Sequence, residues 1–429
     1  MPMLKLFDNR FFKNGKIKVL SLILLFGLLK GIVFISLVPI WQAPDEPAYY
    51  QEIEVVANEH KIPGINAEKF INHPPLYYLT ATPFYLVGSL WGETASFYAI
   101  RVFGILLLIG IALIGYLVAK ELFSDNDFIQ LMTPALILLN PQLTFINGSV
   151  NSDALLNFFF ALFFWQGTLL VKRGVSMKAV IFMSLVIFGG IYTKERFLIA
   201  IYALGVLLFL LLIRFLWRTF NLSLTSLFRK IRVVDVFVFL VSAFLIFSSL
   251  DLISKEQARI IYISQDSNFG NYLFRQFWGY FGWLNIPMSI VEYELLNWLP
   301  ILAVVGLVVA FLRVVSTPKY ILSKDNKAFS ITVENKKNLI SPDHLITYIY
   351  FASSIILSML AISQYELYGA GSQGRYLFVI IIPYFIFISL GLSNLATPDN
   401  NKRLFAFIFI GLFIINFIAL FNYIVPFYY

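Results

Sequence analysis

Long apolar runs alternate with shorter polar connections along the chain. A helix needs roughly 20 apolar residues to cross the hydrocarbon core of a bilayer, so the pattern predicts an all-α polytopic membrane protein with about eleven transmembrane helices. The third and fifth spans are the least regular, because Pro134 and the pair Gly189–Gly190 interrupt them. The spans are expected to begin near Leu20, Ala95, Phe128, Asp153, Ala179, Phe197, Val234, Trp298, Leu345, Tyr376 and Leu404.

Basic residues fall in every second connection, and this fixes the expected orientation. By the positive-inside rule, connections rich in Lys and Arg face the cytoplasm. A basic amino-terminal segment precedes the first span. The apolar stretch of this span is too long for the core of a signal peptide, and no small-residue cleavage site follows it. The amino terminus is therefore expected in the cytoplasm and, with an odd number of spans, the carboxyl terminus outside. The expected cytoplasmic connections carry Lys120; Lys172, Arg173 and Lys178; Arg214, Arg218, Arg229, Lys230 and Arg232; Arg313 to Lys337; and Lys402 with Arg403.

The outer connections include the two longest in the chain, 41–94 and 252–297. Both combine aromatic residues with mixed charge, which is typical of ordered loops rather than linkers. In the first loop, an apolar stretch over 76–90 follows two prolines. Because Pro suits the first turn of a helix and Tyr and Trp suit the interface, we expect a helix lying at the outer surface there, not a twelfth span. The shorter outer connections are 140–152, 193–196 and 363–375.

The composition agrees with a single transmembrane domain, residues 1–429, without a separate soluble domain. Hydrophobic residues make up 59% of the chain and charged residues 13%, whereas about a quarter of a soluble domain is charged. The net charge of +8 is spread between the apolar runs, which favours contact with membrane lipids over nucleic acid. The absence of cysteine excludes disulfides and thiolate metal sites.

Directly after the first span, the stretch WQAPDEPAYYQEIEVV sets two acids side by side, Asp45 and Glu46. If a helix follows, Asp45, Tyr49 and Glu52 share one face. One interpretation is that Asp45 only caps this helix. The other is that a carboxylate at the bilayer surface takes a proton from a hydroxyl, or holds a divalent cation against a phosphate.

Two cations in one short outer connection run against the charge rule, and a third cation ends another outer connection. Lys194 and Arg196 flank Glu195 in a short loop, where they could snorkel beside an internal ion pair or clamp a phosphate. Arg375 follows the glycine-rich stretch YGAGSQG, whose backbone N–H groups together with an arginine would make an anion site. The alternative is an anchoring Arg after a flexible connection.

Other candidate residues also have two interpretations. Trp283, in an aromatic loop, could stack on a sugar face or belong to an interfacial belt. Asp153 would cap the fourth span with or without a further function. The three histidines, His60, His73 and His344, lack the spacing of a metal site. If a metal binds, oxygen ligands favour Mg²⁺ or Mn²⁺ over zinc.

Several stretches, in chain order, resemble motifs of the GT-C superfamily of membrane glycosyltransferases: PDEPAYYQEIEVV, NHPPLYY, Asn151-Ser152-Asp153, FGWLNIP and Gln373-Gly374-Arg375-Tyr376. The chain resembles most closely an uncharacterised bacterial branch with P-D-E-P and Q-G-R-Y motifs. It is more distantly similar to protein mannosyltransferases and lipid A aminoarabinose transferases. Where the latter have an arginine after the acid and a lysine before the prolines, this chain has Ala48 and His73.

The resemblance implies a GT-C-like bundle that moves a sugar from a polyprenyl-phosphate donor to a glycan or lipid-linked acceptor outside the cytoplasm, with inversion. It implies a bacterial plasma membrane, with the active site on the outer face. Asp45 would be the catalytic base, with Glu46 beside it as a second catalytic residue. The donor phosphate would be held by Lys194, Arg196, Arg375 and His73, and the substrates by Tyr49, Glu52, Asp153, Gln373, Tyr376 and Trp283.

Two other functions remain open on the sequence. A transporter or flippase for lipid-linked saccharides would place ionisable residues near the bilayer midplane, whereas this chain concentrates them at one surface. A non-catalytic lipid-binding subunit would have a groove for the prenyl tail of the lipid and would tolerate the loss of Asp45.

Overall fold

The computed structural model describes residues 15–62, 73–220, 269–315, 320–325, 328–333, 341–367, 372–397 and 400–429. Within them, eight helices are long and apolar enough to cross a membrane, or nine if one bent pair counts as a span. The protein is therefore an all-α, multi-pass membrane protein, as expected. The seventh expected span, near Val234, lies outside the described residues, and every other expected span coincides with a described helix.

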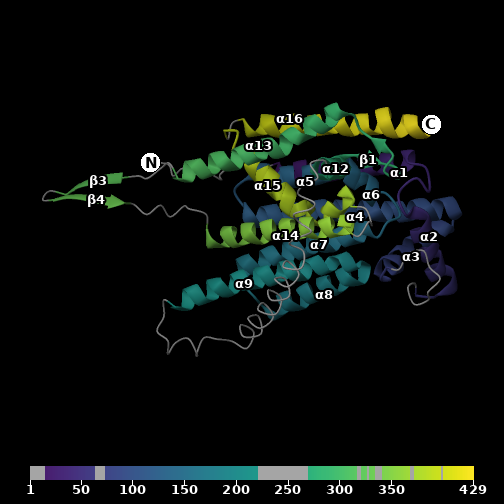
Figure 1. Ribbon diagram of the computed structural model, residues 1–429, viewed down its shortest axis with the longest axis horizontal. Coiled ribbons are helices and arrows are strands. Elements are labelled where there is room, and N and C mark those ends of the chain that lie inside the picture. The colour runs from purple at the N-terminus through teal and green to yellow at the C-terminus, as the bar shows by residue number, and fades with distance from the viewer. Residues whose placement is uncertain are drawn as a thin grey trace.

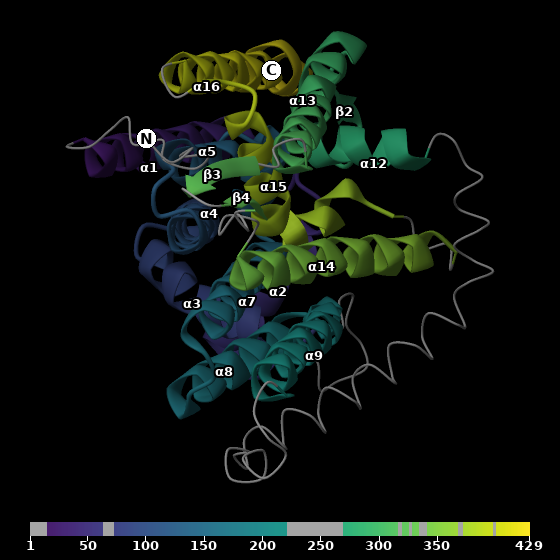
Figure 2. The same ribbon diagram turned by 90° about the vertical axis from the view of Figure 1, so that its left-hand side faces the viewer.

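The spanning helices form one bundle (Figure 1). Seen along the bundle in Figure 2, α1 and α16 border one side and α8 and α9 the opposite side, with α7 between them. The eight long helices are α1 (Lys16–Leu37), α4 (Glu93–Leu122), α7 (Asp153–Arg173), α9 (Leu198–Phe220), α13 (Ile290–Val315), α14 (Pro342–Leu367), α15 (Ile381–Ser393, after the 3-10 turn η3, Gly374–Ile380) and α16 (Asn401–Ile418, continued by η4, Ala419–Ile424, and α17, Val425–Tyr428). Helix α8 (Met177–Thr193), at the fifth expected span, is a shorter apolar helix.

Small residues let some of these helices approach closely, as is common between helices in a membrane. A Cβ on Gly306 of α13 would lie 1.9 Å from the backbone oxygen of Gly391 in α15. A Cβ on Gly391 would lie 2.1 Å from the backbone oxygen of Ala303. The α13–α15 contact therefore has no room for a side chain at either glycine.

The third expected span is a broken helix. Helix α5 (Asp127–Leu138) and helix α6 (Pro141–Asn147) meet at an angle of 58°. Pro141 lacks the N–H that would continue α5, and Asn140 instead caps α6, accepting a hydrogen bond from Leu143 N at 2.7 Å. Side chains replace the lost helix bonds: Lys30 donates to the oxygen of Leu138 and Asn416 to that of Leu139.

The first long loop folds into helices at one end of the bundle. Helix α2 (Glu46–Glu54) continues through the π-helical turn η1 (Val55–Glu59), and α3 spans Leu76–Ser89, close to the expected 76–90. Tyrosines of α2 and α3 build a second apolar cluster there with α4 and the start of α7. Figure 1 shows α2 and α3 at the end where the chain terminates, with the hairpin β3–β4 (Tyr320–Asp325, Ala328–Val333) at the other.

The second long loop differs from its expected bounds. Helix α13 starts at Ile290, not near Trp298, so the last turns of the expected loop are helical. The described part before it contains α12 (Phe269–Trp278) and a two-stranded turn, β1 (Tyr280–Phe281) paired with β2 (Ile286–Pro287). This segment packs against α6 and η3 and so reaches the same end of the bundle as α2 and α3.

Candidate functional site

Asp45 stands immediately before α2 but does not cap it. Its backbone has φ of 66°, in the left-handed region, and its side chain makes no capping hydrogen bond. The interpretation that Asp45 is only a side-chain cap of this helix is therefore wrong. The carboxylate instead accepts a hydrogen bond from Arg375 Nη2 at 2.9 Å, and 38% of the side chain is exposed. A non-glycine residue in this conformation is uncommon and often marks a functional position.

Arg375 belongs to η3, whose first residue is fixed from two directions. Gln276 of α12 accepts a hydrogen bond from Gly374 N at 2.6 Å. A Cβ on Gly374 would lie 2.5 Å from both Gln276 Cβ and Phe277 N, so only glycine fits. The buried guanidinium of Arg375 also faces Asp153, with Nε 3.7 Å from Oδ2.

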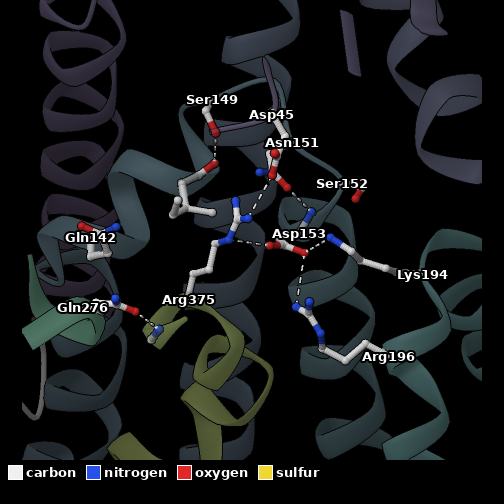
Figure 3. A network of polar contacts seen from close by, with 12 residues as sticks. Asp45, Gln142, Ser149, Asn151, Ser152, Asp153, Lys194, Arg196, Gln276 and Arg375 are labelled. Atoms are coloured by element: carbon white, nitrogen blue, oxygen red, sulfur yellow. Dashed lines mark hydrogen bonds and ion pairs between the residues drawn. The ribbon is translucent and has the colours of Figure 1, made fainter. Parts of the chain in front are cut away.

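Asp153 opens α7 and is surrounded by cations. Lys194 Nζ lies 2.5 Å from Asp153 Oδ1, and Arg196 Nη1 lies 3.6 Å from the same oxygen. Together with Arg375, three cationic side chains therefore face one buried carboxylate. Figure 3 shows these side chains converging from α7, the α8–α9 junction and η3.

We refer to Asp45, Asp153, Lys194, Arg196 and Arg375 as the charge cluster. Four of its members lie in three connections that the charge pattern assigned to a single side of the membrane, and the fifth, Asp153, opens the span that follows a fourth such connection. The structure brings all five together at one end of the bundle. Three cations and two carboxylates leave one positive charge in excess. Such an excess beside partly buried donors is suited to binding an anion.

Aromatic side chains line the Lys194 side of the cluster. Tyr49 Oη accepts from Ser152 Oγ at 3.1 Å and from Lys194 Nζ at 3.3 Å. The His73 ring stacks on Tyr49, with 6.1 Å between ring centroids. The Arg196 guanidinium lies 3.7 Å from the centroid of the Tyr376 ring, a cation–π contact that holds its plane.

Burial shifts the ionisation of these groups. It lowers the pKa of His73 to about 4, with help from the positive charge of Lys194, so the imidazole is neutral at physiological pH. Burial also lowers the pKa of Lys194 and, with the nearby Asp153 carboxylate, raises the pKa of Tyr49. Tyr49 therefore stays a neutral phenol that supports the cluster by hydrogen bonding.

Glu46 lies apart from the charge cluster. It is fully buried and paired with Arg101, which donates from Nε at 3.0 Å and from Nη2 at 2.9 Å. Val150 N and Ala43 N also donate to the Glu46 carboxylate. Because its oxygens are occupied and screened from solvent, this position does not fit the catalytic role that we expected of Glu46. The pairing with Arg101 joins α2 to α4.

The remaining expected substrate residues are spread around the cluster. Glu52 is buried on α2, and Gln373 precedes Gly374 at the start of η3. Trp283 is half exposed, and its indole N–H donates to the backbone oxygen of Trp41 at 3.2 Å. Trp283 thus links the β1–β2 turn to the first loop.

Neutral amides that we had not selected tie the second loop to this end of the bundle. Asn140 donates to Phe277 O at 3.1 Å. Gln142 donates to Tyr280 O at 3.0 Å and accepts from Tyr280 N at 2.8 Å. The sequence signal for them is a polar Asn-Pro-Gln at the start of the outer connection 140–152. Figure 3 shows Gln142 and Gln276 beside η3.

Asp45 and Asp153 are the residues of this cluster that could supply oxygen ligands to a divalent cation, and both are ion-paired to basic side chains. The described parts of the chain contain no group of three His, Cys, Asp or Glu residues close enough to hold a metal ion.

No protein-family model matches the chain, and neither does any curated protein. A solved structure does: the apo form of the oligosaccharyltransferase of Archaeoglobus fulgidus, a GT-C glycosyltransferase, superposes with a TM-score of 0.52 at 12% identity. The match covers 97% of this chain and 56% of that one. The fold is GT-C-like.

Two further structures of the oligosaccharyltransferase from that organism match with lower TM-scores. The complex with an inhibitory peptide and a dolichol-phosphate gives 0.46 at 12% identity, over 97% of this chain and 56% of that chain. The form tethered to an acceptor peptide gives 0.45 at 13% identity, over 97% and 55%. This GT-C-like chain thus spans little more than half the length of those proteins, and at such identities the likeness is one of fold. The GT-C-like fold expected from the sequence is confirmed.

Proposed function

We propose that the protein is an inverting membrane glycosyltransferase that moves a sugar from a polyprenyl-phosphate donor to a glycan or lipid-linked acceptor on the outer face of a bacterial plasma membrane. The observation that carries this proposal is the pairing of the partly exposed Asp45 with a buried cluster that has an excess of positive charge. The cluster lies at the ends of spanning helices, the level at which a lipid phosphate meets water.

Asp45 acts as the general base. Its carboxylate takes the proton of an acceptor hydroxyl, whose oxygen then forms a bond to the anomeric carbon of the donor sugar. The bond between that carbon and the phosphate oxygen breaks, and its electron pair leaves with the polyprenyl phosphate. A single displacement of this kind inverts the anomeric configuration.

The cations stabilise the charge that develops on the leaving phosphate. In a partly buried site, preorganised donors stabilise such charge far more than water does. Arg375, Lys194 and Arg196 supply three positive charges, and one of them is not balanced by the carboxylates of the cluster. The apolar helix surfaces beside the cluster accommodate the polyprenyl tail.

The test is transfer by the purified full chain in nanodiscs, supplied with radiolabelled polyprenyl-phosphate sugars and membrane fractions as acceptors. Base catalysis contributes about 10²–10⁴-fold, so Asp45→Asn should lower transfer by at least about 10²-fold. Glu59→Gln is the matched control, because Glu59 is an exposed acid of the same loop. Transfer by Asp45→Asn at the wild-type rate would overturn the assignment, and the lipid-linked sugar that accumulates in a deletion strain would identify the donor.

A further inference from the structure

Arg375 holds its guanidinium in a fixed orientation, and two of its nitrogens, Nε and Nη1, make no hydrogen bond among the described residues, Nε facing Asp153 only as an ion pair. Nη2 donates to Asp45 Oδ2 at 2.9 Å, and Nε lies 3.7 Å from Asp153 Oδ2. Because the group is planar, these two contacts determine the direction of the third nitrogen, Nη1. Nη1 is buried and has no hydrogen-bond partner among the described residues. A buried donor of this kind costs free energy, so it marks a position for a ligand atom.

A second unused donor belongs to Asn151, which is fully buried. Asn151 Oδ1 accepts from Asp153 N at 2.8 Å. This bond fixes the amide, because the reverse orientation would set two donors against each other. The Nδ2 group therefore points away from Asp153, where it too is buried without a hydrogen-bond partner in the described part of the chain. In Figure 3, Asn151 and the free end of the Arg375 guanidinium lie on the Asp45 side of the Asp153 ion pairs.

The other two cations of the cluster are already engaged. Lys194 Nζ contacts Asp153 at 2.5 Å and donates to Tyr49 at 3.3 Å. Arg196 faces Asp153 and lies over the ring of Tyr376. In Figure 3, Lys194 and Arg196 approach Asp153 from the side opposite Arg375.

We propose that Asn151 Nδ2 and Arg375 Nη1 together bind an oxygen of a phosphate group, and that Lys194 and Arg196 are positioning residues that act through Asp153. Two N–H donors, one of them charged, require an acceptor, and the cluster carries one positive charge in excess. A phosphate oxygen satisfies both conditions. This inference rests on the proposed function, because it names the residues that hold the donor phosphate in that reaction.

The experiment measures binding of two probes, farnesyl phosphate and inorganic phosphate, to the full chain in detergent by calorimetry. Asn151→Asp keeps the oxygen that accepts from Asp153 N but replaces the Nδ2 donor with a second oxygen. Loss of one charge-assisted contact should weaken binding about tenfold to a hundredfold. Binding of farnesyl phosphate alone would assign the site to a lipid-linked phosphate, and binding of both probes would assign it to the phosphate group itself.

Asn126→Asp is the matched control, because Asn126 also accepts a backbone N–H at a helix start, from Ile129 at 3.1 Å, but at the other end of α4. This variant should bind both probes as the wild type does. If Asn151→Asp unfolds, Asn151→Ser decides, because the serine hydroxyl still accepts from Asp153 N while Nδ2 is removed. The proposal is overturned if a folded Asn151 variant binds phosphate like the wild type, or if the wild type binds neither probe.

Phosphate binding at Asn151 and sugar transfer can be tested separately. If the protein binds farnesyl phosphate through Asn151 but transfers no sugar, the phosphate site stands and the glycosyltransferase assignment is wrong. If the protein transfers sugar and Asn151→Asp has no effect, the glycosyltransferase assignment stands and the assignment of Asn151 to the phosphate site is wrong.

Discussion

The carboxylate of Asp45 and the guanidinium of Arg375 lie 2.9 Å apart, although 330 residues separate them in the chain. Asp45 follows the first span and Arg375 precedes α15, so the contact closes the bundle at one end. It also brings the proposed base into direct contact with a proposed phosphate ligand.

Replacement of the carboxylate by an amide should destabilise the protein more at Glu46 than at its neighbour Asp45. Glu46→Gln leaves Arg101 as an uncompensated buried charge, which costs about 3–5 kcal/mol. Asp45 is partly exposed, and Asp153 still faces Arg375 when Asp45 is neutral, so Asp45→Asn should destabilise the protein less than Glu46→Gln. Thermal unfolding in detergent, followed by fluorescence, measures both. Equal stability of the two variants would contradict the structural role given to the Glu46–Arg101 pair.

His73 should make the folded protein less stable in acid. Its pKa is lowered to about 4 in the folded state, against an ordinary value near 6.5 in the unfolded chain. Between these values the unfolded state binds more protons, so the contribution of His73 to stability falls as the pH drops from about 6.5 to 4 and is constant above that window.

The measurement is the melting temperature of wild type and His73→Phe across this pH range. Phe preserves a ring to stack on Tyr49 but does not titrate. We expect the wild type to lose stability relative to His73→Phe on acidification. Parallel curves for the two proteins would show that His73 is not held neutral by burial.

Gly374→Ala should impair function with a small effect on helix content. The new Cβ would lie 2.5 Å from Phe277 N, so η3 must shift and carry Arg375 with it. We expect weaker farnesyl phosphate binding, by about tenfold, since misplacement by about 1 Å is costly in a preorganised site. Gly411→Ala in α16 is the control, because nothing lies within 4 Å of a Cβ there. Unchanged binding by Gly374→Ala would show that η3 can move without displacing Arg375.

Lys30 should be a structural residue in spite of its place inside a span. Its Nζ donates to Leu138 O at 2.5 Å and to Asn416 Oδ1 at 2.9 Å. Lys30→Met leaves these acceptors at the helix break unsatisfied, at about 1–3 kcal/mol for each buried group. The exposed Lys18 provides the control, Lys18→Met.

A double-mutant cycle with Asn416→Leu tests the assignment of Lys30. If both side chains repair the break between α5 and α6, their effects on the free energy of unfolding should be coupled rather than additive. Additive effects would instead leave Lys30 open to a role in moving a substrate or an ion through the span.

The apolar pattern by itself determined that the chain crosses a membrane many times, and where nearly every described span lies, because crossing hydrocarbon requires a fixed length of apolar helix. It also selected Asp45, Lys194 and Arg375, since charges are rare in such a chain. Only the tertiary structure could separate Asp45 from Glu46, which stand side by side in sequence. The left-handed backbone at Asp45 turns one carboxylate toward Arg375 while the other is buried against Arg101. The roles of Asn151, Gln142 and Gln276 likewise depend on which distant backbone groups they meet, and hydrophobic periodicity does not encode those contacts.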